Sequence, residues 1–258
     1  MQLIRDGVSL FFEDSGSGGP PLVFVHGWCC DHTYFAPQVE YFRRTHRVVA
    51  VDLRGHGQSD QPQQAYTMGA FADDVVWLCA QLRIEKPVII GHSMGGVIAL
   101  VLAAEFPGVP AAIVSVDSPI LFPPSLPPTL QPFLQALRGP NFRAAQQQFT
   151  SDMLFMPSDD AARKARIIDA MGRAPQHVMA SAFEGILGFD HAAAVAACRV
   201  PWLALYAAQV TSDLARMREL CPQVVTGQTV GAGHFHQLEV PEQVNAMLAR
   251  FLAVALPQ

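Results

Sequence analysis

Short apolar runs and longer amphipathic stretches alternate along most of the chain. Runs of four or five apolar residues are typical of buried strands, and apolar residues at helical spacing between them are typical of helices. Strands are predicted at 22–25, 48–51, 88–90, 113–116, 202–206 and 224–230, and a hairpin at 1–14. Helices are predicted at 34–44, at 68–82, directly after Ser93 and from Pro241 onwards. Strands that alternate with helices indicate an α/β domain with a mostly parallel, doubly wound sheet.

This alternation stops between residues 119 and 197. Residues 119–132 include six prolines, and the rest of the segment has a helical pattern. We therefore expect a helical cap at 119–197, inserted into an α/β core formed by residues 1–118 and 198–258. The aromatic and methionine side chains of the cap include Phe122, Phe133, Phe149, Met153, Phe155, Met156, Met171, Met179, Phe183 and Phe189. Because cap and core meet at a cleft, these side chains predict an apolar pocket for a small-molecule substrate.

A glycine-punctuated turn around Ser93 joins the predicted strand at 88–90 to the helix that follows. Gly91 to Gly95 form the pattern G-x-S-x-G in the strand–turn–helix context that this pattern requires. A serine on so sharp a turn has a strained backbone, and the two glycines avoid collisions with neighbouring Cβ atoms. The turn places Ser93 at a helix N-terminus, where the free amide of Met94 can face a developing oxyanion.

A serine hydroxyl becomes a good nucleophile when a base lies within hydrogen-bond reach, and His234 is the best candidate for that base. It lies in a glycine-rich loop after the last predicted strand. In a parallel sheet, ligands bind beyond the carboxyl ends of the strands. The candidate residues that fall just past predicted strand ends are His26, Asp52, Ser93, Asp117 and His234. This coincidence predicts one shared site.

An oxyanion needs a second backbone amide beside that of Met94, and Trp28 in the loop after strand 22–25 is positioned to supply it. His92 is adjacent to the serine, but the turn should direct its side chain elsewhere. His236 forms an H-x-H pair with the candidate base, a spacing that can indicate a metal site. No further carboxylate–histidine cluster in the sequence supports a metal, so we expect neither a metal nor a cofactor.

The chain resembles the α/β-hydrolase superfamily over essentially its full length. Four motifs in the right order carry the resemblance: His26-Gly27-Trp28, Asp52 to Ser59, Gly91 to Gly96 and Gly233-His234-Phe235. The resemblance implies the α/β-hydrolase fold, with Ser93 as the nucleophile and His234 as the general base and acid. It also implies an oxyanion hole formed by the amides of Trp28 and Met94, and a mainly structural role for the loop 52–59.

The triad acid is where this sequence departs from the commonest pattern of that superfamily. Many relatives carry the acid in a G-x-x-D segment after the strand equivalent to 202–206, but here the glycine is absent and Asp213 comes late. Asp213 is more typical of the N-cap of a following helix. Asp117 directly follows the strand 113–116, where haloalkane dehalogenases and cofactor-independent dioxygenases of the superfamily often hold their acid. A carboxylate there can orient the histidine, so we predict Asp117 and keep Asp213 as the alternative.

These residues predict a serine hydrolase that cleaves a small to medium apolar carboxylic ester or lactone through an acyl-enzyme. C–C bonds next to a ketone are within reach of the same residues. The alternative is a cofactor-independent ring-cleaving dioxygenase, because residues 27–32 resemble the corresponding loop of the 2,4-dioxygenases. Against this alternative, Met94 stands where those dioxygenases carry histidine. A third hypothesis is a ligand receptor on this scaffold that turns over slowly or not at all.

Composition narrows the class of partner. The 258 residues carry a formal net charge of −5 and no basic run, so we expect neither nucleic acid nor a membrane as partner. The five cysteines are scattered without C-x-x-C spacing and fit reduced thiols. The N-terminal residues show no signal peptide, so we expect a soluble, cytoplasmic enzyme, and the number of subunits stays open.

Overall fold

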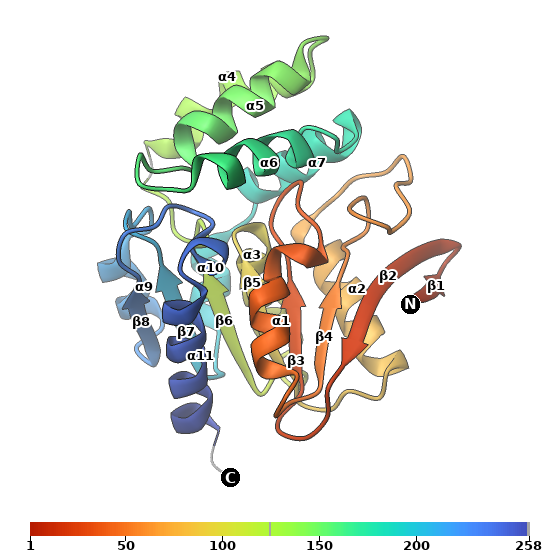
Figure 1. Ribbon diagram of the computed structural model, residues 1–258, viewed down its shortest axis with the longest axis vertical. Helices are drawn as coiled ribbons and strands as arrows, with labels where there is room; N and C mark the ends of the chain where they lie inside the picture. Colours follow the sequence, from red (N-terminus) through yellow and green to blue (C-terminus); the bar gives the residue numbers. More distant parts are fainter. Residues whose placement is uncertain (124, 257–258) are drawn as a thin grey trace.

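The computed structural model describes residues 1–123 and 125–256. Position 124 of the expected cap and positions 257–258 of the expected core lie outside the described residues. An eight-stranded sheet runs through the protein in the order β1-β2-β4-β3-β5-β6-β7-β8 (Figure 1). Its strands are β1 (Gln2–Arg5), β2 (Val8–Ser15), β3 (Leu22–Val25), β4 (Val48–Val51), β5 (Val88–His92), β6 (Ala112–Val116), β7 (Trp202–Tyr206) and β8 (Val224–Gln228).

The direction of the strands divides the sheet into two parts. β2 runs antiparallel to both β1 and β4, whereas every neighbouring pair from β4 to β8 is parallel. Parallel neighbours need crossover connections, and helices on both faces of the sheet supply them. The arrangement confirms the predicted α/β class and the mostly parallel, doubly wound sheet. The strands expected at 22–25, 48–51 and 202–206 coincide with β3, β4 and β7.

Helices bury both faces of the sheet. They are α1 (Ala36–Phe42) and α11 (Pro241–Ala255) on one face, and α2 (Met68–Gln81), α3 (Met94–Glu105) and α8 (His191–Ala197) on the other (Figure 1). Successive residues of a strand point to opposite faces. In β3, Leu22 and Phe24 belong to the apolar cluster of α1 and α11, whereas Val23 and Val25 belong to that of α2 and α3. Because both faces are buried, the strands read as continuous apolar runs.

Several predicted boundaries differ from the observed ones by a few residues, and two of these differences have a clear local cause. The helix expected at 34–44 begins with a separate 3-10 turn, η1 (His32–Phe35), because the carboxylate of Asp31 caps that turn. The last strand ends before Val230, because the amide of Val230 donates to the side chain of Gln243 and not to a neighbouring strand.

Four helices lie above the edge of the sheet where the parallel strands end (Figure 1). They are α4 (Leu126–Leu137), α5 (Phe142–Met153), α6 (Ala161–Met171) and α7 (Gln176–Leu187), here called the cap layer. Within it, α4 packs against α5 and α7, and α5 packs against α6. α8 also falls within the segment 119–197, but it packs against α3 on the face of the sheet.

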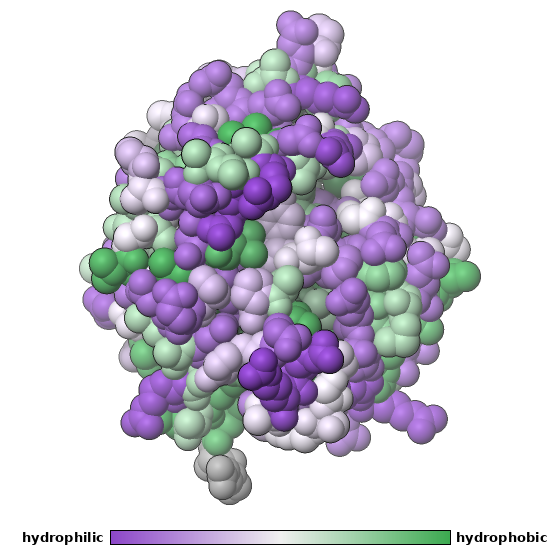
Figure 2. Space-filling view, in the orientation of Figure 1, coloured by the Kyte–Doolittle hydropathy of each residue, from purple (hydrophilic) through white to green (hydrophobic). Residues whose placement is uncertain are grey.

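Two short helices, α9 (Leu214–Leu220) and α10 (His236–Glu239), follow the last two strands. On the face shown in Figure 2 polar residues predominate, and apolar residues form separate small patches. Among the described residues, no helix combines the length and the apolar character that crossing a bilayer requires.

Candidate active site

Ser93 lies on the turn between β5 and α3, with φ 53° and ψ −119°. These angles belong to neither helix nor strand, so the backbone is strained at this residue, as predicted. A Cβ at Gly91 would overlap the carbonyl of Gly95, and a Cβ at Gly95 would overlap the carbonyl of Val25. Glycine is therefore required at both positions. The turn leaves Ser93 in the wall of a cavity.

The two backbone amides expected to form the oxyanion hole lie beside this serine. Met94 is the first residue of α3, and Trp28 follows Gly27, where a Cβ would lie 3.1 Å from the Cβ of Ser93. Within residues 1–123 and 125–256, neither amide donates a backbone hydrogen bond. Two such N–H groups next to a serine are the donors that an oxyanion requires, and their role stays a prediction.

Hydrogen bonds hold the loop of Trp28 from two sides. The buried imidazole of His26 accepts from the amide of Leu53 at 3.0 Å and donates to the carbonyl of Gly27 at 2.8 Å. Burial lowers the pKa of His26, which keeps the ring neutral and able to accept and donate at once. The indole N–H of Trp28 donates to the carbonyl of Met179 in α7 at 2.9 Å. The loop is thereby fixed to both the core and the cap layer.

The carboxylate of Asp117 contacts His234. Its Oδ2 atom accepts from Nδ1 of His234 at 2.6 Å, and its Oδ1 atom accepts from the amide of Ala207 at 2.9 Å. Asp117 directly follows β6 with φ 44°, a value uncommon outside glycine. The carboxylate of Asp213 instead caps α9 and accepts from the amide of Arg216 at 3.0 Å. The structure thus brings Asp117, and not Asp213, to the candidate base.

Two further histidines near the site have their own partners. Nε2 of the buried His92 donates to the carbonyl of His234 at 3.0 Å, and burial lowers the pKa of His92 well below its ordinary range. Nδ1 of His236 lies 2.7 Å from the hydroxyl of Thr229, and burial lowers the pKa of His236 to about 4. The H-x-H pair consists of His234 and His236. His234 bonds Asp117 and His236 bonds Thr229, which argues against a metal held between the two histidines.

Ser93, Asp117 and His234 all line one cavity of about 160 Å³ between the core and the cap layer. Its cap side chains are apolar and include Phe122, Leu126, Leu130, Phe149, Met153, Met171, Phe183 and Ile186. Gln209 and Thr211, from the segment after β7, add two polar side chains. Among the described residues, no lysine or arginine lines this cavity. Such walls suit an uncharged apolar group.

The sequence pattern identifies part of this lining. Of the ten aromatic and methionine side chains noted in the cap segment, seven line the cavity. The other three pack elsewhere, as Phe133 does by stacking on Phe149 with the ring centroids 4.1 Å apart. Leu126 and Leu130 were not expected in the lining. Their spacing of four in a helix is the signal that could have identified them.

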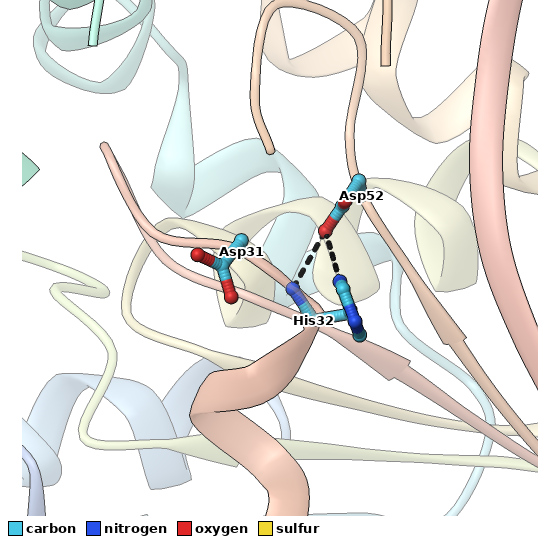
Figure 3. Close-up of side chains that lie close together, drawn as sticks. All are labelled: Asp31, His32 and Asp52. Atoms are coloured by element: carbon cyan, nitrogen blue, oxygen red, sulfur yellow. Dashed lines mark hydrogen bonds and ion pairs between the residues drawn. The ribbon is translucent and has the colours of Figure 1, made fainter. Parts of the chain in front are cut away.

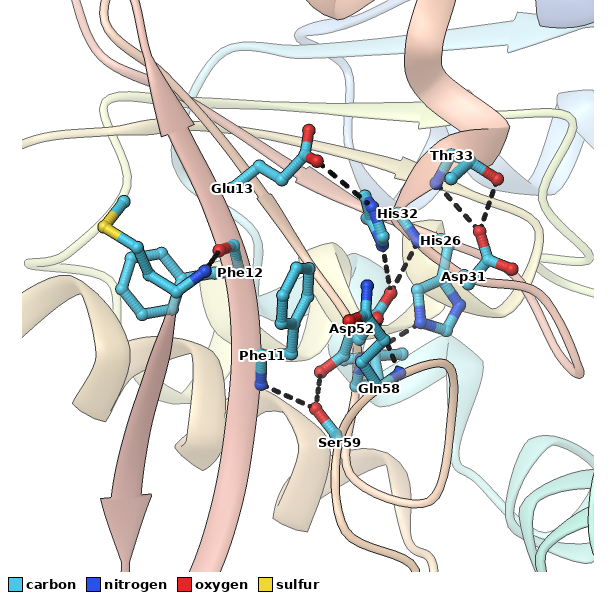
Figure 4. A network of polar contacts seen from close by, with 12 residues as sticks. Phe11, Phe12, Glu13, His26, Asp31, His32, Thr33, Asp52, Gln58 and Ser59 are labelled. Carbon is cyan, nitrogen blue, oxygen red and sulfur yellow. Dashed lines mark hydrogen bonds and ion pairs between the residues drawn. The ribbon is translucent and has the colours of Figure 1, made fainter.

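A second aspartate–histidine contact lies between the loops that follow β3 and β4 (Figure 3). The buried Asp52 accepts from Nδ1 and from the backbone amide of His32, at 2.8 and 2.7 Å, and from the amide of Gln58 at 2.8 Å. The hydrogen bond to Asp52 is the main cause that raises the pKa of His32. Nε2 of His32 lies 3.5 Å from the carboxylate of Glu13 (Figure 4).

Asp31, His32 and Asp52 are close enough together to be considered as metal ligands. Each of these side chains already has a protein partner, however, because Asp31 accepts from Thr33 and Asp52 accepts from His32 (Figure 4). The hydroxyl of Ser59 also donates to the backbone carbonyl of Asp52 at 2.6 Å. The cluster is therefore best described as a network that ties together β2 and the loops after β3 and β4.

A family model described as the alpha/beta hydrolase fold matches residues 20–241 of this chain. The AB hydrolase superfamily protein YisY of Bacillus subtilis is 42% identical over 105 residues, which are 40% of this chain and 39% of that protein. The bifunctional esterase/perhydrolase DCH of Acinetobacter calcoaceticus is 36% identical over 110 residues, 42% of this chain and 40% of that protein. The matches thus span about two fifths of the length of these curated relatives.

Solved structures match over nearly the whole chain. The enol-lactonase from Burkholderia xenovorans superposes with a TM-score of 0.86 at 22% identity, covering 98% of this chain and 99% of that one. A thermophilic esterase from Thermogutta terrifontis superposes with a TM-score of 0.82 at 26% identity, covering 97% and 96%. At this level of identity the likeness shows a shared fold.

Proposed function

This chain belongs to the α/β-hydrolase family, and from that premise we propose that it is a serine hydrolase of small to medium apolar carboxylic esters or lactones. The observation that carries the proposal is the contact of 2.6 Å between Asp117 and His234, at a cavity that Ser93 also lines. A nucleophile, a base and a carboxylate that orients the base are the groups that acyl transfer through a serine requires.

In the proposed reaction, His234 takes the proton of Ser93 while Oγ attacks the carbonyl carbon, and Asp117 stabilises the imidazolium through Nδ1–H. The amides of Met94 and Trp28 stabilise the negative charge that develops on the carbonyl oxygen. The C–O bond to the alcohol then breaks, and His234 protonates the leaving oxygen. His234 next deprotonates a water that attacks the acyl carbon. The carboxylic acid leaves as the serine regains its proton.

The cavity walls support an uncharged apolar substrate. Its volume of about 160 Å³ is close to that of an apolar cavity of about 150 Å³ that holds benzene. Because no lysine or arginine side chain of the described residues lines the cavity, a carboxylate or phosphate there would lose water without gaining a counter-charge. An esterase/perhydrolase among the relatives and an enol-lactonase among the structural neighbours support ester and lactone bonds as the targets.

Hydrolysis of p-nitrophenyl esters, from acetate to octanoate, tests the proposal when the parent protein is compared with Ser93→Ala. We expect the parent to hydrolyse the shorter esters, and the loss of the hydroxyl to lower kcat by about 10⁴-fold or more. Circular dichroism checks that both proteins are folded. The proposal is wrong if the folded parent hydrolyses none of the esters or if Ser93→Ala retains the parent rate.

A cofactor-independent ring-cleaving dioxygenase is the second candidate. The position of Asp117 after β6, in contact with His234, favours it, because such dioxygenases often hold their acid there. Met94 stands against it, since those enzymes carry histidine at that position. Oxygen consumption with a hydroxyquinolone-type ring, in a protein that hydrolyses no ester, would replace the first proposal with this one.

A further inference from the structure

The segment between α5 and α6 lies directly on the loop that carries His234. The backbone amide of His234 donates to the carbonyl of Leu154 at 3.0 Å. The amide of Gly233 donates to Oδ1 of Asp159 at 2.9 Å, and Oδ2 of the same carboxylate accepts from the amide of Met156 at 2.7 Å. One carboxylate from the cap segment therefore joins its own loop to the loop of the proposed base.

Gly233 permits this contact because it has no Cβ atom. A Cβ at this position would overlap the carboxylate of Asp159, and would lie 3.0 Å from the amide nitrogen of Met156 and 3.1 Å from the carbonyl oxygen of Leu154. Gly233 is not one of the glycines with a positive φ. The close approach of the segment 154–159, and not an unusual backbone conformation, therefore explains why a glycine precedes His234.

An ion pair also joins the cap segment to the short helix that follows the loop of His234. Arg163, in the first turn of α6, pairs with Glu239 at 2.5 Å, and Glu239 belongs to the short helix that follows the histidine loop. The side chains of Glu239 and Arg163 are 9% and 31% exposed, so water and salt screen this pair less than a fully exposed ion pair. On the core side, His92 donates to the carbonyl of His234. The cap segment thus binds the N–H group of His234, and the core binds its C=O group.

We propose that Asp159 is a positioning residue for His234, and that the segment 154–159 holds the histidine loop where the base can act. The inference rests on the proposed function, because it takes His234 as the base. That base must reach both Asp117 and Ser93, and a misplacement of about 1 Å can cost on the order of 10²-fold in rate. Asp117 holds only the imidazole, whereas the segment 154–159 holds the backbone amides of Gly233 and His234.

Two adjacent acidic residues provide a matched pair of variants. Asp159→Asn leaves a single carbonyl oxygen, which cannot replace two oxygens that accept from Met156 and Gly233. Asp160→Asn removes the same charge one residue later. Asp160 caps α6 by accepting from the amide of Arg163, and asparagine caps helices equally well. Neither aspartate lines the cavity.

Steady-state kinetics on a p-nitrophenyl ester separate positioning from substrate binding. We expect Asp159→Asn to lower kcat by about 10- to 100-fold, because the base is displaced, while KM stays within about twofold. Asp160→Asn should keep both constants within about twofold of the parent. Equal kcat values in the two variants, whether reduced or not, would overturn the inference.

Amide hydrogen exchange tests the same contact without any substrate. In the parent, the amides of Gly233 and His234 donate to the cap segment, so we expect residues 231–240 to exchange faster in Asp159→Asn and unchanged in Asp160→Asn. Exchange at the parent rate in Asp159→Asn would overturn the inference. If the parent hydrolyses no ester but the two variants differ in exchange, the proposed function is wrong. The difference in exchange would still show that Asp159 holds the loop of His234 in place.

Discussion

Asp52 and Asp117 both follow parallel strands of the sheet, and each accepts a hydrogen bond from Nδ1 of a histidine. The contact measures 2.8 Å between Asp52 and His32, and 2.6 Å between Asp117 and His234. At the point of contact the two pairs are therefore alike. A search for carboxylates bonded to histidines would find both.

The surroundings of the two pairs differ. Asp52 is fully buried and accepts two backbone amides, and the second ring nitrogen of His32 faces the carboxylate of Glu13. Asp117 accepts one backbone amide, and its histidine lines a cavity shared with Ser93. A carboxylate can orient an imidazole in either setting. The group that faces the second ring nitrogen, Nε2, therefore decides whether the oriented imidazole can accept a proton from a nucleophile.

The largest effect expected comes from exchanging the two histidines for glutamine. His234→Gln should lower kcat/KM for a p-nitrophenyl ester by about 10⁴-fold, because the base is removed. His32→Gln should stay within a few-fold of the parent per folded molecule, because its ring does not line the cavity. Kinetics at equal concentrations of folded protein measure both. Similar losses in the two variants would show that the pairs do not differ in function.

Asp117→Asn is expected to have the next largest effect, with a fall in kcat of about 10³-fold, since the orienting carboxylate is lost while the nucleophile and base remain. Asp213→Asn is the matched control, because asparagine can still cap α9. Its kcat should equal that of the parent. The opposite pattern would assign the acid to Asp213.

Asp52→Asn should affect stability instead of turnover. Breaking a buried pair from one side typically costs about 3 kcal/mol, because the remaining partner loses its counter-charge. Urea unfolding should therefore show a loss of about that size, with kcat unchanged at concentrations of urea where the protein is folded. An unfolding free energy equal to that of the parent would contradict the structural role of the buried pair.

The smallest effect expected is a dependence of stability on pH. The hydrogen bond to Asp52 raises the pKa of His32 above its ordinary 6.5, so its stabilising charge is fully present below that value and is lost as the pH rises through the raised pKa. Burial alone would raise the pKa of Asp52, but hydrogen bonds from His32 and the backbone lower it below 3.8. Asp52 therefore stays charged except in strong acid.

The measurement is the difference in unfolding free energy between the parent and His32→Gln at two pH values. It should be larger at about pH 5, where His32 is protonated and Asp52 is charged, than at about pH 8.5. A difference that does not change between these conditions would contradict a contribution to stability from the titration of His32 in this pH range.

Local pattern accounts for much of the fold and of the candidate site. The strands at 22–25, 48–51 and 202–206 are visible because burial of both faces leaves uninterrupted apolar runs. Ser93 is visible because its turn requires glycines at fixed spacing. Asp117 is visible because it directly follows a predicted strand, at a position where some members of the superfamily that the chain resembles hold their acid. Each of these features depends on residues that are neighbours in the sequence.

Contacts between distant segments are not visible in such patterns. Asp52 pairs with a histidine 20 residues earlier, and Asp159 accepts from Gly233, 74 residues later. The residues around either aspartate are equally compatible with a surface loop. Helix α8 shares the helical pattern of the cap segment, yet packs against α3, because the chain must return to the sheet at β7. Tertiary packing, which the local pattern does not encode, decides all three cases.

The bonds between Asp159 and Gly233 also bear on chimeric enzymes. A grafted cap that lacks a carboxylate at the position of Asp159 would not bind the amide of Gly233, and from the proposed role of Asp159 we expect lower turnover even where the pocket fits. A graft that includes residues 231–235 from the same donor keeps the two together. The two stretches are separated by 74 residues in the sequence, and a chimera that preserves this contact must exchange them together.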